Sequence, residues 1–179
     1  APLSWYYTQG EKRDWKRTAA LLEEFVQEGD IIIVHNAYGT QTGHLGYYFS
    51  GPAGTLLAIP RRDPNVMTIF EDAWQDHNRL WYVRKVLQAD NLLEVEAWLR
   101  KNNFLTFAFG GSGIGLNYEG LFISYGNRNV MSEEEKLVEW AEILDKAFEL
   151  KPDKWYMYEA LSDFYIRQRD YEKAIALWG

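Results

Sequence analysis

One stretch, residues 14–36, constrains the fold more than any other, because it joins an amphipathic helix to a buried strand. Asp14 is a suitable N-cap, and Gly29 is a typical helix end. The apolar positions of one helical face follow at Trp15, Ala19, Leu22 and Val26. Ile31 to Val34 is an unbroken β-branched run, which predicts a strand covered on both faces. We therefore expect a central strand in a parallel or mixed sheet.

Four further segments have strand patterns, at 55–59, 79–86, 104–109 and 120–125. Helical patterns separate the earlier ones: a short helix at 66–76, and a longer one capped by Asp90 with Leu92, Val95, Trp98 and Leu99 facing inward. The link between the last two strands is too short for a crossover helix, which indicates an antiparallel pair at one end of the sheet. The sequence thus predicts a Rossmann-like three-layer α/β domain over residues 1–128, with a mostly parallel sheet and an antiparallel end hairpin.

The composition changes at residues 127–129, and the remaining sequence has only helical patterns. Ser132 and Glu135 have the spacing of a capping box. An offset of 34 residues aligns Leu137 with Tyr171 and Leu144 with Trp178, and residues 158–174 resemble a tetratricopeptide repeat. We expect an all-α tetratricopeptide-like tail over 129–179, which offers a surface for a protein partner at 132–179. Because such repeats need neighbours, we also expect the natural chain to continue past Gly179.

Charge and composition exclude several classes of function. The net charge of −7 disfavours a nucleic-acid partner, since phosphate binding needs clustered Lys and Arg. The chain has no cysteine, which excludes disulfides, cysteine nucleophiles and thiolate metal sites. No apolar run approaches the roughly 20 residues of a membrane span.

The familiar catalytic motifs are not present. The glycines at 110–115 follow G-x-x-G-x-G rather than the dinucleotide pattern, and a strand follows them instead of a helix, so we interpret them as a hairpin loop. Ser112 lacks the second glycine of a nucleophile elbow. There is no D-x-D pair, and Asp72, Asp76 and His77 match no ligand spacing and suit a solvated helix end. We predict no catalytic residue, no metal and no cofactor in this chain.

The best polar cluster follows the first strand. It comprises His35, Asn36, Tyr38 and His44, and open α/β sheets bind ligands at this end of their strands. Tyr47 and Tyr48 add rings with hydroxyl groups, which suit a sugar. Ser112 and Asn117 lie in a second loop that should open on the same edge. The alternative interpretation of the cluster is ordinary capping and loop hydrogen bonding.

A resemblance to a known family rests on short motifs in order: Tyr6-Tyr7, Asp14-Trp15, Gly29-Asp30 with its apolar strand, Trp81-Tyr82-Val83 and Trp98-Leu99. This arrangement, over residues 5–128, resembles the soluble C-terminal domain of polytopic membrane glycosyltransferases. They form the superfamily of dolichyl-phosphate-mannose–protein mannosyltransferases and bacterial aminoarabinose transferases. The resemblance implies an extracytoplasmic location, and attachment to a membrane through upstream sequence. No catalytic residue of the family maps onto this chain.

Three functions follow as alternatives. The first is a non-catalytic extracytoplasmic domain of a membrane glycosyltransferase with a polyprenyl-phosphate sugar donor, which positions a glycan or lipid-linked acceptor, or a protein partner. The second is a free-standing interaction module built on the tetratricopeptide-like helices. The third is a soluble α/β enzyme with its site near His35 and His44. The isolated chain is expected to transfer no sugar.

Overall fold

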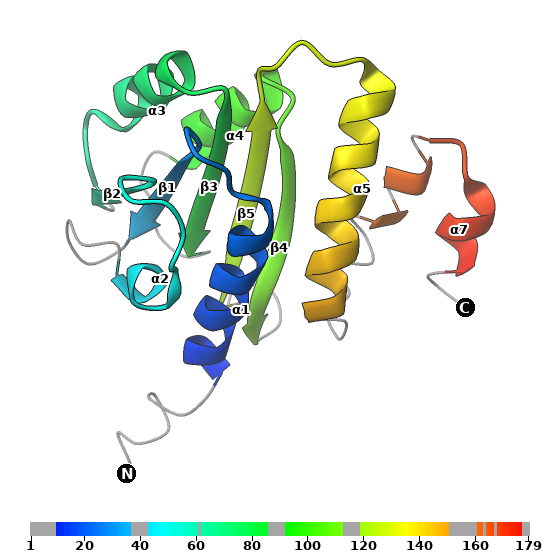
Figure 1. The fold of residues 1–179 in the computed structure, drawn as a ribbon, viewed down its shortest axis with the longest axis horizontal. Coiled ribbons are helices and arrows are strands. Elements are labelled where there is room, and N and C mark those ends of the chain that lie inside the picture. Colours follow the sequence, from blue (N-terminus) through cyan, green and yellow to red (C-terminus); the bar gives the residue numbers. More distant parts are fainter. Residues whose placement is uncertain are drawn as a thin grey trace.

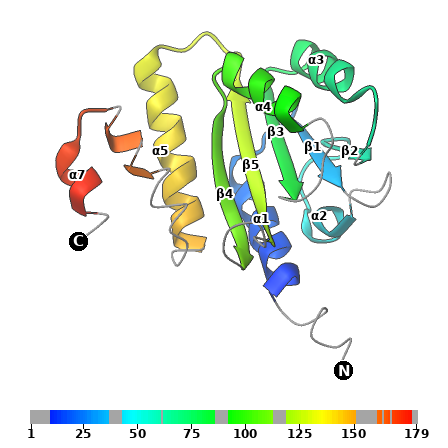
Figure 2. The ribbon, with the colours of Figure 1, turned by 180° about the vertical axis from the view of Figure 1, so that it is seen from behind.

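The computed structural model describes residues 10–36, 43–60, 62–85, 92–112, 119–150, 161–162, 164–166 and 168–176. These residues form a five-stranded sheet between two layers of helices (Figures 1 and 2). The strands are β1 (Ile31–Asn36), β2 (Leu56–Pro60), β3 (Arg79–Lys85), β4 (Leu105–Ser112) and β5 (Glu119–Asn127). All five predicted strands are thereby confirmed, within a few residues at their ends.

The sheet has the order β2-β1-β3-β5-β4. β1 pairs in parallel with β2 and with β3, while β5 is antiparallel to both β3 and β4. The prediction of a mostly parallel sheet is therefore wrong, because the sheet is mixed; β1 is an interior strand between β2 and β3, as predicted, and β3 occupies the centre. The physical reason is that β5 inserts between β3 and β4. Its side chains are buried on both faces, as Ile123 and Ser124 illustrate, so it suits an interior position.

The helices divide between the two faces of the sheet. On one face lie α1 (Gly10–Phe25), α2 (Gly43–Tyr48) and α5 (Glu133–Leu150), and on the other lie α3 (Val66–Asp76) and α4 (Leu92–Lys101). Figures 1 and 2 show α1 in front of the sheet and α4 behind it. A short helix, α7 (Tyr171–Ala176), follows near the C-terminus.

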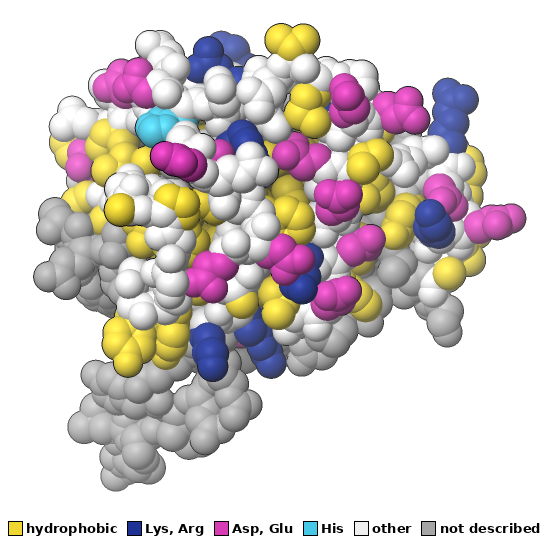
Figure 3. Space-filling model, in the orientation of Figure 1, with side chains coloured by type: hydrophobic (Ala, Val, Ile, Leu, Met, Phe, Trp, Pro, Cys, Tyr) yellow, Lys and Arg dark blue, Asp and Glu magenta, His cyan; other side chains and the backbone are white. Residues whose placement is uncertain are grey.

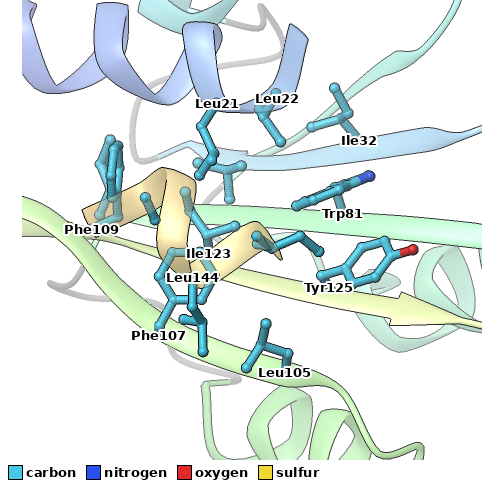
Figure 4. Close-up of a cluster of buried hydrophobic side chains, with 14 of the residues drawn as sticks. Leu21, Leu22, Ile32, Trp81, Leu105, Phe107, Phe109, Ile123, Tyr125 and Leu144 are labelled. Carbon is cyan, nitrogen blue, oxygen red and sulfur yellow. The ribbon is translucent and has the colours of Figure 1, made fainter. Parts of the chain in front are cut away.

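Alternation along the strands supplies both cores. Ile32 and Trp81 point toward α1, whereas Ile33 and Tyr82 point toward α3, because successive side chains in a strand alternate. Trp15 of α1 is only 5% exposed, which confirms its predicted burial. Figure 4 shows Leu21 and Leu22 of α1 above the strands, within the larger cluster.

The described part of residues 129–179 does not form the predicted all-α tetratricopeptide-like tail, and this part of the fold-class prediction is also wrong. Ile143, Leu144 and Ala147 of α5 are fully buried in the same cluster as α1 and the sheet. Leu144 lies among side chains of β4 and β5 in Figure 4. The apolar stripe that indicated a repeat instead covers sheet surface that α1 leaves free. The division at residue 128 stays a prediction, although this hydrophobic cluster extends across it.

Two predicted helix starts have different outcomes. Asp14 is not an N-cap, because α1 begins at Gly10; its backbone oxygen instead accepts a hydrogen bond from Thr18 Oγ1 at 2.8 Å. The capping box at α5 is confirmed. Glu135 N–H donates to Ser132 Oγ at 3.1 Å, and Ser132 N–H donates to Glu135 Oε2 at 2.7 Å. Asp90 lies outside the described residues.

Candidate functional site

The strand directions bring three chain segments to one end of the sheet. β4 runs antiparallel to β5, and β5 runs antiparallel to β3, so β4 points the same way as β1 and β3. Their carboxyl ends lie together at the lower end of Figure 1, where α1 also begins. We call this the carboxyl end and the opposite one the amino end. The segments that continue from these strands, residues 37–42, 86–91 and 113–118, lie outside the described residues.

A buried histidine–tyrosine pair lies near the carboxyl end. His35 Nδ1 and Tyr82 Oη are hydrogen bonded at 2.9 Å, and both side chains are buried between the sheet and the α3–α4 layer. Burial raises the pKa of Tyr82 well above its ordinary value, so its phenol stays neutral. The pair therefore fixes the imidazole ring at the end of β1.

Beside this pair is a buried arginine. His35 and Arg84 are register partners on β1 and β3, and Arg84 donates to Glu96 of α4 across 2.7 Å. The guanidinium lies over the Phe122 ring, 4.5 Å from its centroid. Burial lowers the pKa of Arg84, and the Glu96 carboxylate opposes that effect. Because Glu96 is 30% exposed, this ion pair reaches the surface on one side.

Aromatic side chains occupy the other side of the sheet at the same end. His44 of α2 stacks on Trp15 of α1, with ring centroids 6.2 Å apart and planes 22° apart. Next to it, Tyr47 meets Tyr48 edge to face at 5.0 Å. Tyr47 is 83% exposed, so one flat ring with a hydroxyl group faces solvent at this end.

The structure therefore separates the residues that the sequence grouped. His35 belongs to the α3–α4 side, whereas His44, Tyr47 and Tyr48 belong to the α1–α2 side. The backbones of Asn36 and Ser112 end β1 and β4 at the carboxyl end, while their side chains lie outside the description. Tyr38 and Asn117 lie outside the described residues. A single site that uses both histidines is thus not formed by the described side chains.

A second polar network lies at the amino end. Arg79 at the start of β3 donates to the backbone oxygen of Phe25 at 2.9 Å and to Tyr125 Oη at 2.8 Å. It also lies 3.5 Å from the Asp30 carboxylate and 3.8 Å from Glu139 Oε1 of α5. One arginine thus links α1, β1, β5 and α5.

The Glu139 carboxylate completes this network. It accepts hydrogen bonds from Tyr125 Oη at 2.6 Å and from Asn127 Nδ2 at 3.1 Å. Burial raises the pKa of Tyr125, and its hydrogen bond to Glu139 adds to that rise. Burial also raises the pKa of Asp30, opposed by the Gln27 N–H and by Arg79. We call Asp30, Arg79, Tyr125, Asn127 and Glu139 the amino-end network.

Sequence reasoning missed the residues that organise both ends. Arg79 and Arg84 stand in an otherwise apolar strand segment that helices cover on both faces. A charged residue in such a strand requires a buried partner, and this was the available signal. The identity of the partners, Glu139 and Glu96, depends on tertiary packing that the sequence pattern does not give.

Among the described side chains, His, Asp and Glu nowhere gather in a group of three or more that could hold a metal ion. Nor does the described part of the chain contain a helix with the length and apolar character of a membrane span. Comparison with models of protein families, with characterised proteins and with solved structures found no match.

Proposed function

We propose that this chain is a non-catalytic extracytoplasmic domain of a membrane glycosyltransferase that uses a polyprenyl-phosphate sugar, and that it positions the acceptor at the carboxyl end. The observation that carries the proposal is the exposed Tyr47 ring at this end, supported by Tyr48 and adjacent to the His44–Trp15 stack. A solvent-exposed ring that packs against a second aromatic side chain can stack on a sugar ring and offer it a hydroxyl group.

The buried polar groups at the same end lie on the opposite side of the sheet from Tyr47, and they are paired with one another. His35 is bonded to Tyr82, and Arg84 is bonded to Glu96. A nucleophile needs a base within hydrogen-bond reach, and that base needs an orienting group. The described side chains at this end instead hold one another in place, which suits a rigid support for a binding surface.

The residues that carry the family resemblance are framework residues. Trp15, Trp81 and Tyr82 are buried, and Asp30 belongs to the amino-end network. Because these residues are structural, the resemblance concerns the fold and not a catalytic site. This agrees with a domain of a glycosyltransferase whose catalytic group lies in another part of the full-length protein.

A protein-interaction role is the second candidate. Ile166, Tyr171 and Ile175 in the C-terminal part are 48%, 57% and 72% exposed. Large exposed apolar side chains near one another in sequence favour a protein contact. The third alternative, an enzyme with both His35 and His44 in its site, loses support because those side chains lie on opposite sides of the sheet.

A transfer assay tests the proposal. The purified chain is incubated with a mannotetraose acceptor and, in separate reactions, a nucleotide-linked and a polyprenyl-phosphate-linked mannose. We expect no product from either donor. Product from the purified chain, lost on Tyr82→Phe or Arg84→Met while the variant stays folded, would assign catalysis to the carboxyl end and refute the non-catalytic role.

A further inference from the structure

The short helix α2 exposes two aromatic side chains that are one turn apart. His44 and Tyr47 are both exposed, and Tyr47 is 83% exposed. Residues three apart on a helix are neighbours, with about 5–6 Å between their Cβ atoms. The two side chains therefore start from neighbouring positions on the outer surface of one helix. Figure 3 shows a yellow patch over α2, at the lower left of the molecule.

The sequence of α2 explains why the Tyr47 ring stays open to solvent. A side chain on a helix leans toward the preceding turn, so the Tyr47 ring extends over positions 43 and 44. Position 43 is a glycine, which has no side chain to cover the ring, and position 44 is the second aromatic side chain. Gly46, directly before Tyr47, is also exposed and adds no side chain. Open space therefore remains beside the Tyr47 ring on the side of His44.

Contacts with α1 hold α2 in place beneath the two rings. Leu45 of α2 is fully buried in the cluster that includes α1 and the sheet. At the start of α2, His44 stacks on the buried Trp15 with ring centroids 6.2 Å apart. Just past its end, the Ser50 N–H donates to Glu23 Oε1 at 2.6 Å. Because both ends of the helix are attached to α1, the rings are ordered before a ligand binds, which lowers the entropic cost of binding.

We propose that Tyr47 and His44 each receive one sugar unit, so that the acceptor is an oligosaccharide of at least two units that lies along α2. This inference rests on the proposed function, which assigns acceptor binding to this end, and it adds the second ring and the minimum size of the acceptor. A sugar ring stacks on each aromatic face, and the tyrosine hydroxyl group and the imidazole nitrogens exchange hydrogen bonds with sugar hydroxyl groups. Because the two rings occupy separate positions on the helix, a single sugar unit covers only one of them.

Amide-shift titrations with mannose, mannobiose and mannotetraose test this inference. We expect the affinity to rise roughly fivefold from mannose to mannobiose, the gain that one aromatic contact gives, and to change little from mannobiose to mannotetraose. His44→Ala should remove that gain and leave the binding of mannose at Tyr47 unchanged. His44→Phe keeps a flat ring and should retain most of the gain. Tyr47→Ala should abolish the shifts with mannotetraose.

Matched controls lie away from α2. His77→Ala removes the histidine ring that follows α3, and Tyr171→Ala removes a tyrosine of α7 that is 57% exposed. Both should bind the three sugars like the unaltered chain, and circular dichroism checks that each variant is folded. Equal affinity of the unaltered chain for mannose and mannobiose, or an unchanged gain in His44→Ala, would overturn the inference and leave the proposed function standing. If none of the three sugars shifts residues 43–48, the inference and the proposed function both fail.

Discussion

The two ends of the sheet use buried charge in different ways. At the amino end, Arg79 of β3 connects Asp30, which precedes β1, with Tyr125 of β5 and Glu139 of α5. At the carboxyl end, Arg84 has the Glu96 partner, and His35 has Tyr82. The amino-end network holds the layers together, whereas the carboxyl-end pairs fix side chains beside an exposed surface. The difference shows that a buried ion pair is not evidence of a site until its connections are traced.

Removing each arginine gives the largest contrast. Arg79→Met leaves the Asp30 and Glu139 carboxylates without their cation, and should lower the free energy of unfolding by about 3–5 kcal/mol. Arg84→Met keeps similar apolar volume but leaves only Glu96, which water reaches, so the loss should be about 1–2 kcal/mol. Urea unfolding measures both. Equal losses would show that the two ends contribute alike to stability.

The two tyrosine hydroxyl groups provide a smaller contrast. Tyr125 Oη accepts from Arg79 and donates to Glu139, whereas Tyr82 Oη is bonded to His35. Tyr125→Phe should therefore lower the free energy of unfolding by about 1–3 kcal/mol, and Tyr82→Phe by about 1 kcal/mol or less. Phenylalanine retains the aromatic ring in both variants, so each variant loses only its hydroxyl group. The two losses of stability can therefore be compared directly. A larger loss at Tyr82 would reverse our assignment of the structural role.

Alkaline pH acts on both ends together, because a buried tyrosine lies at each end. Tyr82 and Tyr125 have folded-state pKa values above the ordinary 10.0, so they stabilise the fold fully below pH 10. Above pH 10 the unfolded chain releases these protons first, and stability falls as pH rises toward the folded-state pKa values. Each tyrosine contributes up to about 1.4 kcal/mol per pH unit in that window.

Urea unfolding between pH 9 and pH 11 measures this dependence, because this range includes the ordinary tyrosine pKa of 10.0. Tyr82→Phe and Tyr125→Phe should each reduce the slope, and the double variant should reduce it further, while Tyr165, whose pKa burial also raises, retains part of it. A slope that is unchanged in the double variant would mean that other groups cause the alkaline loss.

The elements were predictable because their signals are local. The β-branched run at 31–34 and the capping box at Ser132 depend on neighbours in sequence, and both formed as expected. The strand order was not predictable in this way, since nothing local indicates that β5 inserts beside β3. The apolar stripe on α5 likewise indicates that one face of the helix is buried, but it does not indicate which element covers that face. Strands of the sheet cover it, and not a second helical repeat.

The candidate site was predicted at the carboxyl end of the sheet, and this location stays a prediction. The rule that ligands lie beyond the carboxyl ends of strands pointed to His35 and to the tyrosines of α2. It gave no information on which face each side chain would take, and His35 and His44 fell on opposite faces. Arg84 and Glu96 went unnoticed because their pairing joins a strand to a helix.

Backbone amide shifts during titration with mannotetraose test the central claim, that the amino end stabilises the fold and the carboxyl end binds. We predict shifts in residues 43–48 and at the carboxyl ends of β1 and β3, with residues 133–150 unchanged. Tyr47→Ala should abolish these shifts, because it removes the exposed ring while leaving the core intact. Shifts confined to residues 133–150 and 161–176, with residues 35–48 silent, would contradict the claim and assign binding to the C-terminal helices.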